Sequence, residues 1–382
     1  MSREQQLSDT DLGEPFDDRW RADALRRQEA LVPTGPTAVS CSAPLGIGGL
    51  GRHFEEFVGA LERREQPAVP ISGSERESEP AQAPRGAALF THARGLARLV
   101  APRSPGARTR DFMVQFDRSA ALRLPAAEHL IAFNGQALEQ FRAAKQARYT
   151  SVSLISANSH LRRVARQHAR AHEQYPIEGS WAAHLLERNL SEYAQADRIY
   201  VSSEYTRDSF LEEGFSDERL AMFPLTPDPR YQADPARVAA PAFEILYVGS
   251  LAVHKGVPLL IDAVRRLSYR DMTLHLLGGW ATRRMRRYVE KACAEDPRIT
   301  HGPGDPLPRL RTARLYVHPA YEDGFAYAPA EAAACGVPLI VTEDTGMKDL
   351  IDERTGLIVR TGDLGELTNA IEAAYRGEIL NG

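Results

Sequence analysis

Apolar segments of strand length alternate with amphipathic segments in the first half of the chain. Phe54, Phe57, Val58 and Leu61 have the spacing of one helix face, and they follow a glycine-rich turn. This order of strand, loop and helix predicts an α/β fold. The stretch 72–107 is rich in Ser, Glu, Pro, Gly and Arg, and its pattern predicts no particular element. Runs typical of strands lie at 37–44, 129–135, 149–157 and 197–203.

The second half alternates more regularly, after a proline-rich stretch. Residues 226–243 contain four prolines, and we expect an interdomain linker there because proline joins neither strand ladders nor helix interiors. Beyond it, apolar runs separated by helical segments predict a parallel sheet with helices on both faces. These runs lie at 244–249, 272–278, 298–302, 314–319, 338–343 and 356–359.

Together the patterns predict two Rossmann-like, doubly wound domains that face a central cleft. We expect a polar N-terminal tail or a loosely docked helix at 1–35, where large apolar residues are few. The first domain is then 36–240 and the second 241–382. Open sheets of this kind bind ligands beyond the carboxyl ends of their strands.

Composition excludes several classes of protein. The chain has 382 residues, 43% of them hydrophobic and 26% charged, which is typical of globular proteins. It contains neither an apolar run of about 18 residues nor a secretory signal, so we expect a cytoplasmic protein without a membrane span. A net charge of −4 does not favour nucleic acid as a partner. The three cysteines are too widely spaced for a disulfide framework or a metal site, and no cluster of His, Asp and Cys suggests a metal cage.

The segment EDGFAYAPAEAAACGVPLIVTEDTG, residues 322–346, carries the strongest signal for a ligand site. Carboxylates stand directly before a predicted helix, and Pro329 is tolerated in its first turn. Backbone N–H groups of Gly324, Phe325 and Ala326 at this positive helix end are suited to bind a diphosphate. The alternative is an acidic first turn that only stabilises its own helix.

Side chains near this segment extend the prediction. Glu331 is placed to accept hydrogen bonds from ribose hydroxyls, and Asp323 to hold a sugar hydroxyl. In VGSLAVHKG, residues 248–256, Lys255 follows a strand end and is suited to act as a point charge on the diphosphate. A solvated turn lysine is the alternative there.

Three other features carry weaker signals. The turn GIGGLGRH, residues 46–53, lets a ligand approach the backbone, but no acidic residue completes a dinucleotide-binding fingerprint. His160 stands just past a predicted strand end, where it faces a ligand or caps a helix. The arginine clusters at 162–170 and 283–287 are suited to an anionic acceptor or peripheral contact with a membrane surface, but we expect solvated helix faces and assign them no site role.

In this order, the segments resemble the retaining glycosyltransferases of the GT-B fold, family four. The family pattern is a carboxylate, GFG, a glutamate eight residues after the carboxylate, then AMACG and proline. Residues that match it in register are Asp323, Gly324, Phe325, Glu331, Cys335, Gly336 and Pro338. Three segments of the first half match as well, namely GGLGRH, ISANSH and ADRIYVSSEYTRDSF.

The resemblance implies transfer of a sugar from a UDP- or GDP-sugar to a glycan, lipid or small-molecule acceptor, with retention of anomeric configuration and without a metal or other cofactor. It implies that 36–240 is the acceptor side and 241–382 the donor side. Catalytic roles fall to His160, which would position the sugar rather than act as a base, and to Asp323, which binds the donor sugar. Donor-binding roles fall to Gly48, Gly49, Lys255, Gly324, Phe325, Ala326 and Glu331.

The chain departs from the family pattern at three places. Ser250 stands where the family has an arginine on the diphosphate, which leaves open whether another arginine substitutes. Glu322 precedes Asp323, and either carboxylate is in a position to reach the sugar. The family also returns a C-terminal helix to the first domain, whereas this chain stops at GEILNG, so we expect domain closure to differ.

Two other functions share the cleft and the diphosphate site. A nucleotide-sugar 2-epimerase would explain both, but not GGLGRH together with ISANSH. A non-catalytic nucleotide-sugar-binding protein would fit Ser250 and the short C-terminus.

Overall fold

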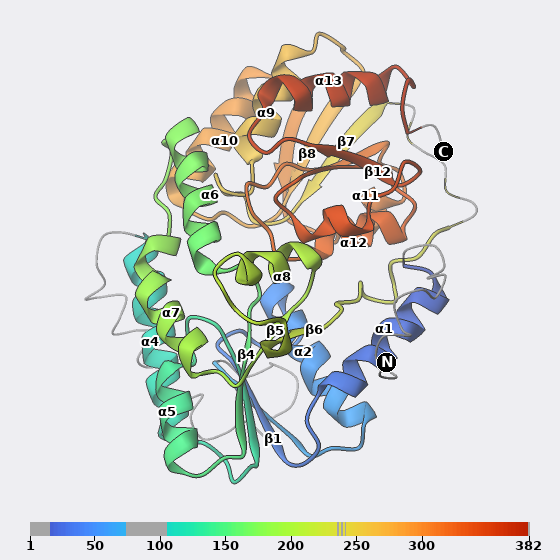
Figure 1. The fold of residues 1–382 in the computed structure, drawn as a ribbon. Coiled ribbons are helices and arrows are strands. Elements are labelled where there is room, and N and C mark those ends of the chain that lie inside the picture. The colour runs from blue at the N-terminus through green and yellow to red at the C-terminus, as the bar shows by residue number, and fades with distance from the viewer. Residues whose placement is uncertain (1–15, 74–104, 235–236, 238–239, 241, 381–382) are drawn as a thin grey trace.

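The computed structural model describes residues 16–73, 105–234, 237, 240 and 242–380. Within them lie two six-stranded sheets (Figure 1), with strand orders β2-β1-β3-β4-β5-β6 and β12-β11-β10-β7-β8-β9. The first sheet contains β1 Thr37–Cys41, β2 Ala68–Ser72, β3 His129–Phe133, β4 Ser151–Ile155, β5 Arg198–Val201 and β6 Leu220–Met222. The second contains β7 Phe243–Val248, β8 Met272–Leu277, β9 Ile299–Gly302, β10 Leu315–His318, β11 Leu339–Thr342 and β12 Gly356–Val359.

All pairings within both sheets are parallel, which confirms the predicted doubly wound α/β fold. The strand order reverses between β1 and β3 in the first sheet and between β7 and β10 in the second. Loops leave such a point in opposite directions, so a crevice opens beyond the carboxyl ends of these strands. The topology therefore predicts a ligand site beside the segments that follow β1, β7 and β10.

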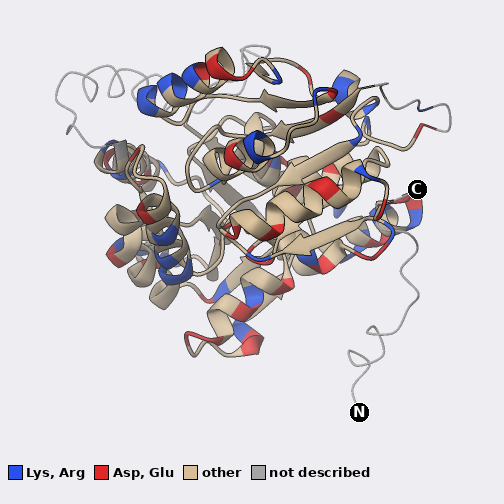
Figure 2. Ribbon diagram, turned by 90° about the horizontal axis from the view of Figure 1, so that it is seen from above, with Lys and Arg blue, Asp and Glu red and all other residues tan. Residues whose placement is uncertain are grey.

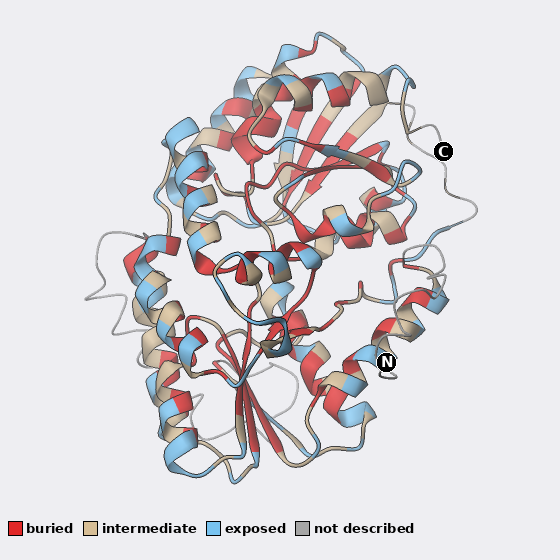
Figure 3. Ribbon diagram, in the orientation of Figure 1, coloured by how far each residue is buried: buried red, intermediate tan, exposed pale blue. Residues whose placement is uncertain are grey.

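Helices surround both sheets, and their charged residues lie along the outside of the molecule (Figure 2), whereas the strands are mostly buried (Figure 3). No described helix is both long and apolar enough to cross a membrane. The helices of the first half are α1 Asp18–Leu31, α2 Gly48–Arg63, α4 Pro105–Ala121, α5 Leu138–Gln146, α6 Leu161–Gln174, α7 Leu186–Gln195 and α8 Glu204–Leu211. Those of the second half are α9 Val257–Arg266, α10 Arg283–Glu295, α11 Leu307–Leu310, α12 Tyr327–Ala334 and α13 Leu364–Tyr375. Short 3₁₀ helices lie at η2 Ala182–Leu185, η3 Asp217–Arg219 and η4 Gly346–Leu350.

Part of the expected N-terminal tail is a docked helix. Asp17 caps α1 by accepting a hydrogen bond from the backbone N–H of Trp20, and the Trp20 side chain is buried. Arg21 and Gln28 on α1 donate hydrogen bonds to the carbonyls of Pro227 and Pro224 at 2.7 and 2.8 Å. The helix thus holds the segment that leads from β6 to β7. Residues 1–15, and nearly all of the stretch 72–107, for which no element is predicted, lie outside the described residues.

The two halves are in direct contact. One apolar cluster contains Phe57 and Tyr200 from the first half and Leu246 and Phe325 from the second. Burial of one continuous apolar cluster stabilises both halves together. The segment after β10 is therefore held against the first half of the chain.

Candidate functional site

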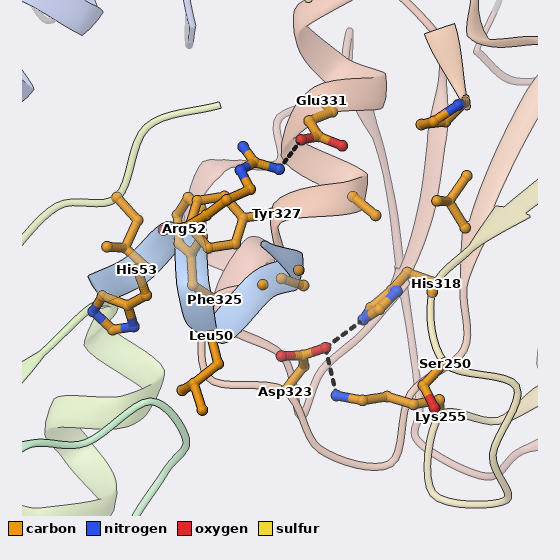
Figure 4. Close-up of a pocket in the computed structure, with 18 of the residues that line it drawn as sticks. Leu50, Arg52, His53, Ser250, Lys255, His318, Asp323, Phe325, Tyr327 and Glu331 are labelled. Atoms are coloured by element: carbon orange, nitrogen blue, oxygen red, sulfur yellow. Dashed lines mark hydrogen bonds and ion pairs between the residues drawn. The ribbon is translucent and has the colours of Figure 1, made fainter. Parts of the chain in front are cut away.

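A cavity of about 710 Å³ lies between the two sheets, beyond the carboxyl ends of β1, β7 and β10 (Figure 4). This volume is ordinary for a small-molecule site. Of the nine residues that the sequence analysis assigns to the site, seven line the cavity, and Gly324 and His160 do not. The seven are Gly48, Gly49, Lys255, Asp323, Phe325, Ala326 and Glu331.

Asp323 lies at the centre of a hydrogen-bonded group on the second domain (Figure 4). Its Oδ2 accepts a hydrogen bond from Lys255 Nζ at 2.7 Å and pairs with His318 Nε2 at 3.2 Å. Burial raises the pKa of Asp323, but Lys255 and His318 outweigh it and hold that pKa below its ordinary value. Asp323 is therefore an ionised carboxylate at the cavity wall.

Glu322 points to a different place from Asp323. It is 1% exposed, and its carboxylate accepts hydrogen bonds from the backbone N–H of Ser159 at 3.0 Å and from Asn158 Nδ2 at 3.2 Å. Only Asp323 of the two lines the cavity. Of the two carboxylates that the sequence leaves open, the geometry favours Asp323 for contact with a ligand.

Arg52 is a cavity residue that the sequence analysis does not single out, although it lies within GGLGRH. It forms an ion pair with Glu331, and its guanidinium stacks 4.3 Å from the centre of the Tyr327 ring (Figure 4). Tyr327 is held in turn by a hydrogen bond from its hydroxyl to Glu56 Oε1 at 2.7 Å. The Nη2 atom of Arg52 is buried and has no hydrogen-bond partner among the described residues, which leaves a donor for a ligand.

The turn before α12 has an unusual backbone conformation and packs closely against the first half of the chain. Ala326 is the N-cap residue, with φ 69° and ψ 96°, a conformation that favours glycine. A Cβ atom on Gly324 would lie 2.5 Å from the carbonyl oxygen of Ala157, so this position requires glycine. The Gly324 carbonyl accepts hydrogen bonds from Ser203 Oγ at 2.5 Å and Thr206 Oγ1 at 3.1 Å. Gly324 therefore lies in the contact between the halves, beside the cavity.

His160 caps a helix outside the cavity. Its Nδ1 accepts a hydrogen bond from the backbone N–H of Arg162 at 3.3 Å, and its ring packs 4.8 Å from that of Tyr193. Burial lowers its pKa to about 4. The histidines that line the cavity are His53 and His318. A contact of His160 with the sugar stays a prediction that this geometry does not support.

The structure corrects one reason for expecting no metal. Two histidines of α6, His168 and His172, meet His254 of the segment between β7 and α9, and one ring nitrogen from each lies within 4.8 Å of the others. The sequence conceals this cluster because His254 is far from the other two along the chain. None of the three lines the cavity, and a site chemistry without metal stays a prediction.

Comparison with known proteins finds similarity for part of the chain. Residues 242–376 match the family model described as glycosyl transferases group 1. The D-inositol 3-phosphate glycosyltransferase of Pseudarthrobacter chlorophenolicus is 30% identical over 207 residues, which are 51% of this chain and 48% of that protein. The enzyme of the same name from Arthrobacter sp. (strain FB24) is 29% identical over 154 residues, 37% of this chain and 36% of the relative. The chain thus spans less than half the length of these curated relatives.

Solved structures match the whole architecture. Sucrose-phosphate synthase from Thermosynechococcus elongatus superimposes with a TM-score of 0.68 at 19% identity, and the match covers 89% of this chain and 90% of that one. Anabaena HepE in complex with UDP-glucose superimposes with a TM-score of 0.58 at 15% identity, covering 90% of both chains. Residues 242–376 are thus similar to the glycosyl transferases group 1 family, and the chain has the GT-B fold of two facing α/β domains.

Proposed function

We propose that this protein transfers a sugar from a nucleoside-diphosphate sugar to an acceptor, with retention of anomeric configuration. The observation that carries the proposal is the pairing of charges in the cavity. Lys255 and Arg52 lie in its wall, and each is paired with a carboxylate, Asp323 or Glu331. Two cations near a helix N-terminus suit a diphosphate, and two carboxylates suit hydroxyl groups of the ribose and the sugar.

Donor binding then exchanges partners between these groups. The diphosphate takes the place of the carboxylates on Lys255 and Arg52, which frees Asp323 and Glu331 to accept hydrogen bonds from hydroxyls. After the exchange each cation has an anionic partner, and each carboxylate has hydrogen-bond donors from the ligand, so no buried charged group is left without a partner. Arg52 supplies the second cation that Ser250 does not provide, and it reaches the cavity from α2 of the first domain.

Sugar transfer places new negative charge on the departing diphosphate. Lys255, Arg52 and the backbone N–H groups at the start of α12 are fixed in position before the reaction, so they stabilise this charge without reorganising. Asp323 orients the sugar while its bond to the diphosphate breaks. His318 is a positioning residue in this scheme, because it contacts Asp323 through Nε2.

The proposal specifies a nucleotide sugar as the donor. It leaves the acceptor open among glycans, lipids and small molecules. Anabaena HepE, which shares the fold, forms a complex with UDP-glucose, so UDP-sugars are the first donors to test, followed by GDP-sugars. The acceptor would enter from the side of the first domain, where Leu50, His53 and Asn158 line the cavity.

A panel of nucleotide sugars tests the proposal. We expect one donor class to raise the thermal midpoint, because a ligand at about 100 times its dissociation constant adds roughly 2.7 kcal/mol to the free energy of unfolding. Without an acceptor, the same donor should be hydrolysed slowly. It should be consumed faster when an extract that contains acceptors is added. Matched free nucleosides serve as controls. An epimerised nucleotide sugar formed without acceptor would identify an isomerase instead, binding without turnover would identify a binding protein, and no stabilisation by any donor would refute a nucleotide-sugar site.

A further inference from the structure

Helix α6 bridges the two domains. Along the chain it connects β4 with β5 of the first sheet. Its C-terminal half packs on the second domain, beside α9 and α10 (Figure 1). Arg170 and Gln174 donate hydrogen bonds to the carbonyls of Thr361 and Gly362, both at 3.2 Å. Ala171 belongs to the apolar core of the second domain.

Three histidines meet where α6 contacts the second domain. His168 and His172 are one helical turn apart and lie on the same face of α6. His254 comes from the segment after β7, and its ring stacks on that of His168 with centres 4.3 Å apart and an angle of 27°. One ring nitrogen from each of the three lies within 4.8 Å of the others.

Some ring nitrogens of these histidines make no hydrogen bond and are available to bind a metal ion. His168 Nδ1 contacts Ser180 Oγ at 3.1 Å, which fixes that ring and leaves Nε2 as the free nitrogen. Both ring nitrogens of His172 are buried and make no hydrogen bond to any described residue, although the backbone of Glu178 lies near. Buried polar atoms without a partner are rare in folded proteins. A hydrogen-bonded outer nitrogen beside a free inner one is also the usual arrangement of a metal-binding histidine.

The backbone that carries His254 is held in place. The His254 carbonyl accepts a hydrogen bond from the backbone N–H of Tyr321 at 2.9 Å, and the N–H of Val253 donates to Glu178 Oε1 at 2.9 Å. Glu178 also accepts a hydrogen bond from Thr282 Oγ1 at 2.6 Å. Glu178 therefore holds the residue next to His254 in place.

We propose that His168, His172 and His254 bind one divalent transition-metal ion, with Zn²⁺ as the first candidate, and that this ion ties α6 to the segment that carries Lys255. Two nitrogens at ~2.0 to 2.1 Å from a tetrahedral ion lie about 3.3 Å apart, whereas the three nitrogens now lie within 4.8 Å of one another. Binding therefore requires the rings to rotate and the stacked pair of His168 and His254 to open. Three imidazoles without a carboxylate or thiolate select Zn²⁺, Ni²⁺ or Cu²⁺ over Mg²⁺ or Ca²⁺. A water completes the fourth position.

The site goes beyond the proposed transferase function, because its ligands do not line the cavity. Its effect on the cavity is indirect: Lys255 follows His254 directly in the chain and lines the cavity wall. Metal binding would restrain the segment between β7 and α9 and the contact between the domains. The ion is thus expected to stabilise the contact between α6 and the second domain without taking part in sugar transfer.

Calorimetric titration of metal-depleted protein with Zn²⁺ tests the site without any donor. We expect one ion bound per chain, and at least about tenfold weaker binding after His172→Ala or His254→Gln. His184→Ala, which removes an exposed histidine outside the cluster, should bind like the parent. The visible spectrum of a Co²⁺-loaded sample should indicate tetrahedral coordination in the parent and lose that signature in His172→Ala.

A second measurement guards against variants that fold poorly. Zn²⁺ should raise the thermal midpoint of the parent and of His184→Ala, but not that of His172→Ala, whose metal-free midpoint and circular dichroism should match those of the parent. The proposal is overturned if the parent binds no Zn²⁺ at one equivalent, or if His172→Ala and His254→Gln bind it as tightly as the parent does. Failure here would leave donor binding untouched, so it is distinguishable from failure of the proposed function.

Discussion

Replacement of Lys255 by alanine tests the electrostatic part of the proposed function. At about 4 Å and an effective dielectric constant of ~20, two unit charges interact by roughly 4 kcal/mol. If about half a charge develops on the departing diphosphate, Lys255 favours the transition state by roughly 2 kcal/mol more than the bound donor. Lys255→Ala should therefore lower kcat by about 30-fold.

Donor affinity should change less than kcat. In the free protein Lys255 is already paired with Asp323 at 2.7 Å, so donor binding exchanges one anionic partner for another. His318, at 3.2 Å, still donates to Asp323 after the substitution. We expect the donor dissociation constant to rise by less than about tenfold.

Initial rates at varied concentrations of the donor found in the panel separate the two effects. Lys291→Ala is the matched control, because Lys291 forms only an exposed surface pair with Glu295, at 3.6 Å. It should leave both constants unchanged. A folded Lys255→Ala protein with kcat within twofold of the parent would remove this lysine from the chemistry, and an equal loss in affinity and kcat would refute the preference for the transition state.

Four further predictions concern the same cavity. Glu331→Ala should weaken donor binding by about 10- to 100-fold, because a hydrogen bond to a charged group contributes roughly 1.5 to 3 kcal/mol; unchanged calorimetric affinity in a folded variant would remove Glu331 from the ribose site. Ser250→Arg should tighten donor binding, because Ser250 is exposed at the cavity wall and a guanidinium there can donate two hydrogen bonds to a phosphate. Donor affinity equal to that of the parent would mean that Arg52 already fills this role. Ala326→Gly should raise the free energy of unfolding by up to about 1 kcal/mol in urea titrations. The reason is that the strain energy of a positive φ of 69°, which glycine relieves, exceeds the entropic cost of the freer unfolded chain. A loss of stability would contradict this strain. Sugar transfer should persist in excess chelator, where the thermal midpoint falls as the histidine site empties; loss of turnover with rescue by Mg²⁺ or Mn²⁺ would show that the cations of the cavity are not sufficient.

Much of the fold follows from local pattern. The runs at 129–135 and 149–157 contain β3 and β4, because a strand buried on both faces is a continuous apolar run. The sequence pattern predicts no strand at β2, Ala68–Ser72. This strand lies at the edge of the first sheet, contains Pro70 and leaves part of its length exposed, so it lacks the pattern of a central strand.

The candidate site is predictable where its chemistry is encoded over a short stretch. Asp323 and Glu331 follow one another at fixed spacing, and Lys255 stands at a strand end, so the sequence alone selects all three. It does not select Arg52, because the partner Glu331 is 279 residues away and nothing near Arg52 signals a charge pair. His318 ends an apolar strand, and only its distance to Asp323 separates it from an ordinary buried histidine.

The packing of Gly324 limits how this protein can be recombined with its relatives. A Cβ atom there would lie 2.5 Å from the Ala157 carbonyl and 2.9 Å from the Cα atom of Asn158, while Ser203 and Thr206 hold the Gly324 carbonyl. The loop that carries Asp323 is thus shaped by side chains and backbone of the other domain. A chimera that exchanges residues 36–240 for those of another enzyme should lose donor affinity unless the graft preserves this contact surface, so acceptor specificity is better altered by loop substitutions than by exchange of the whole domain.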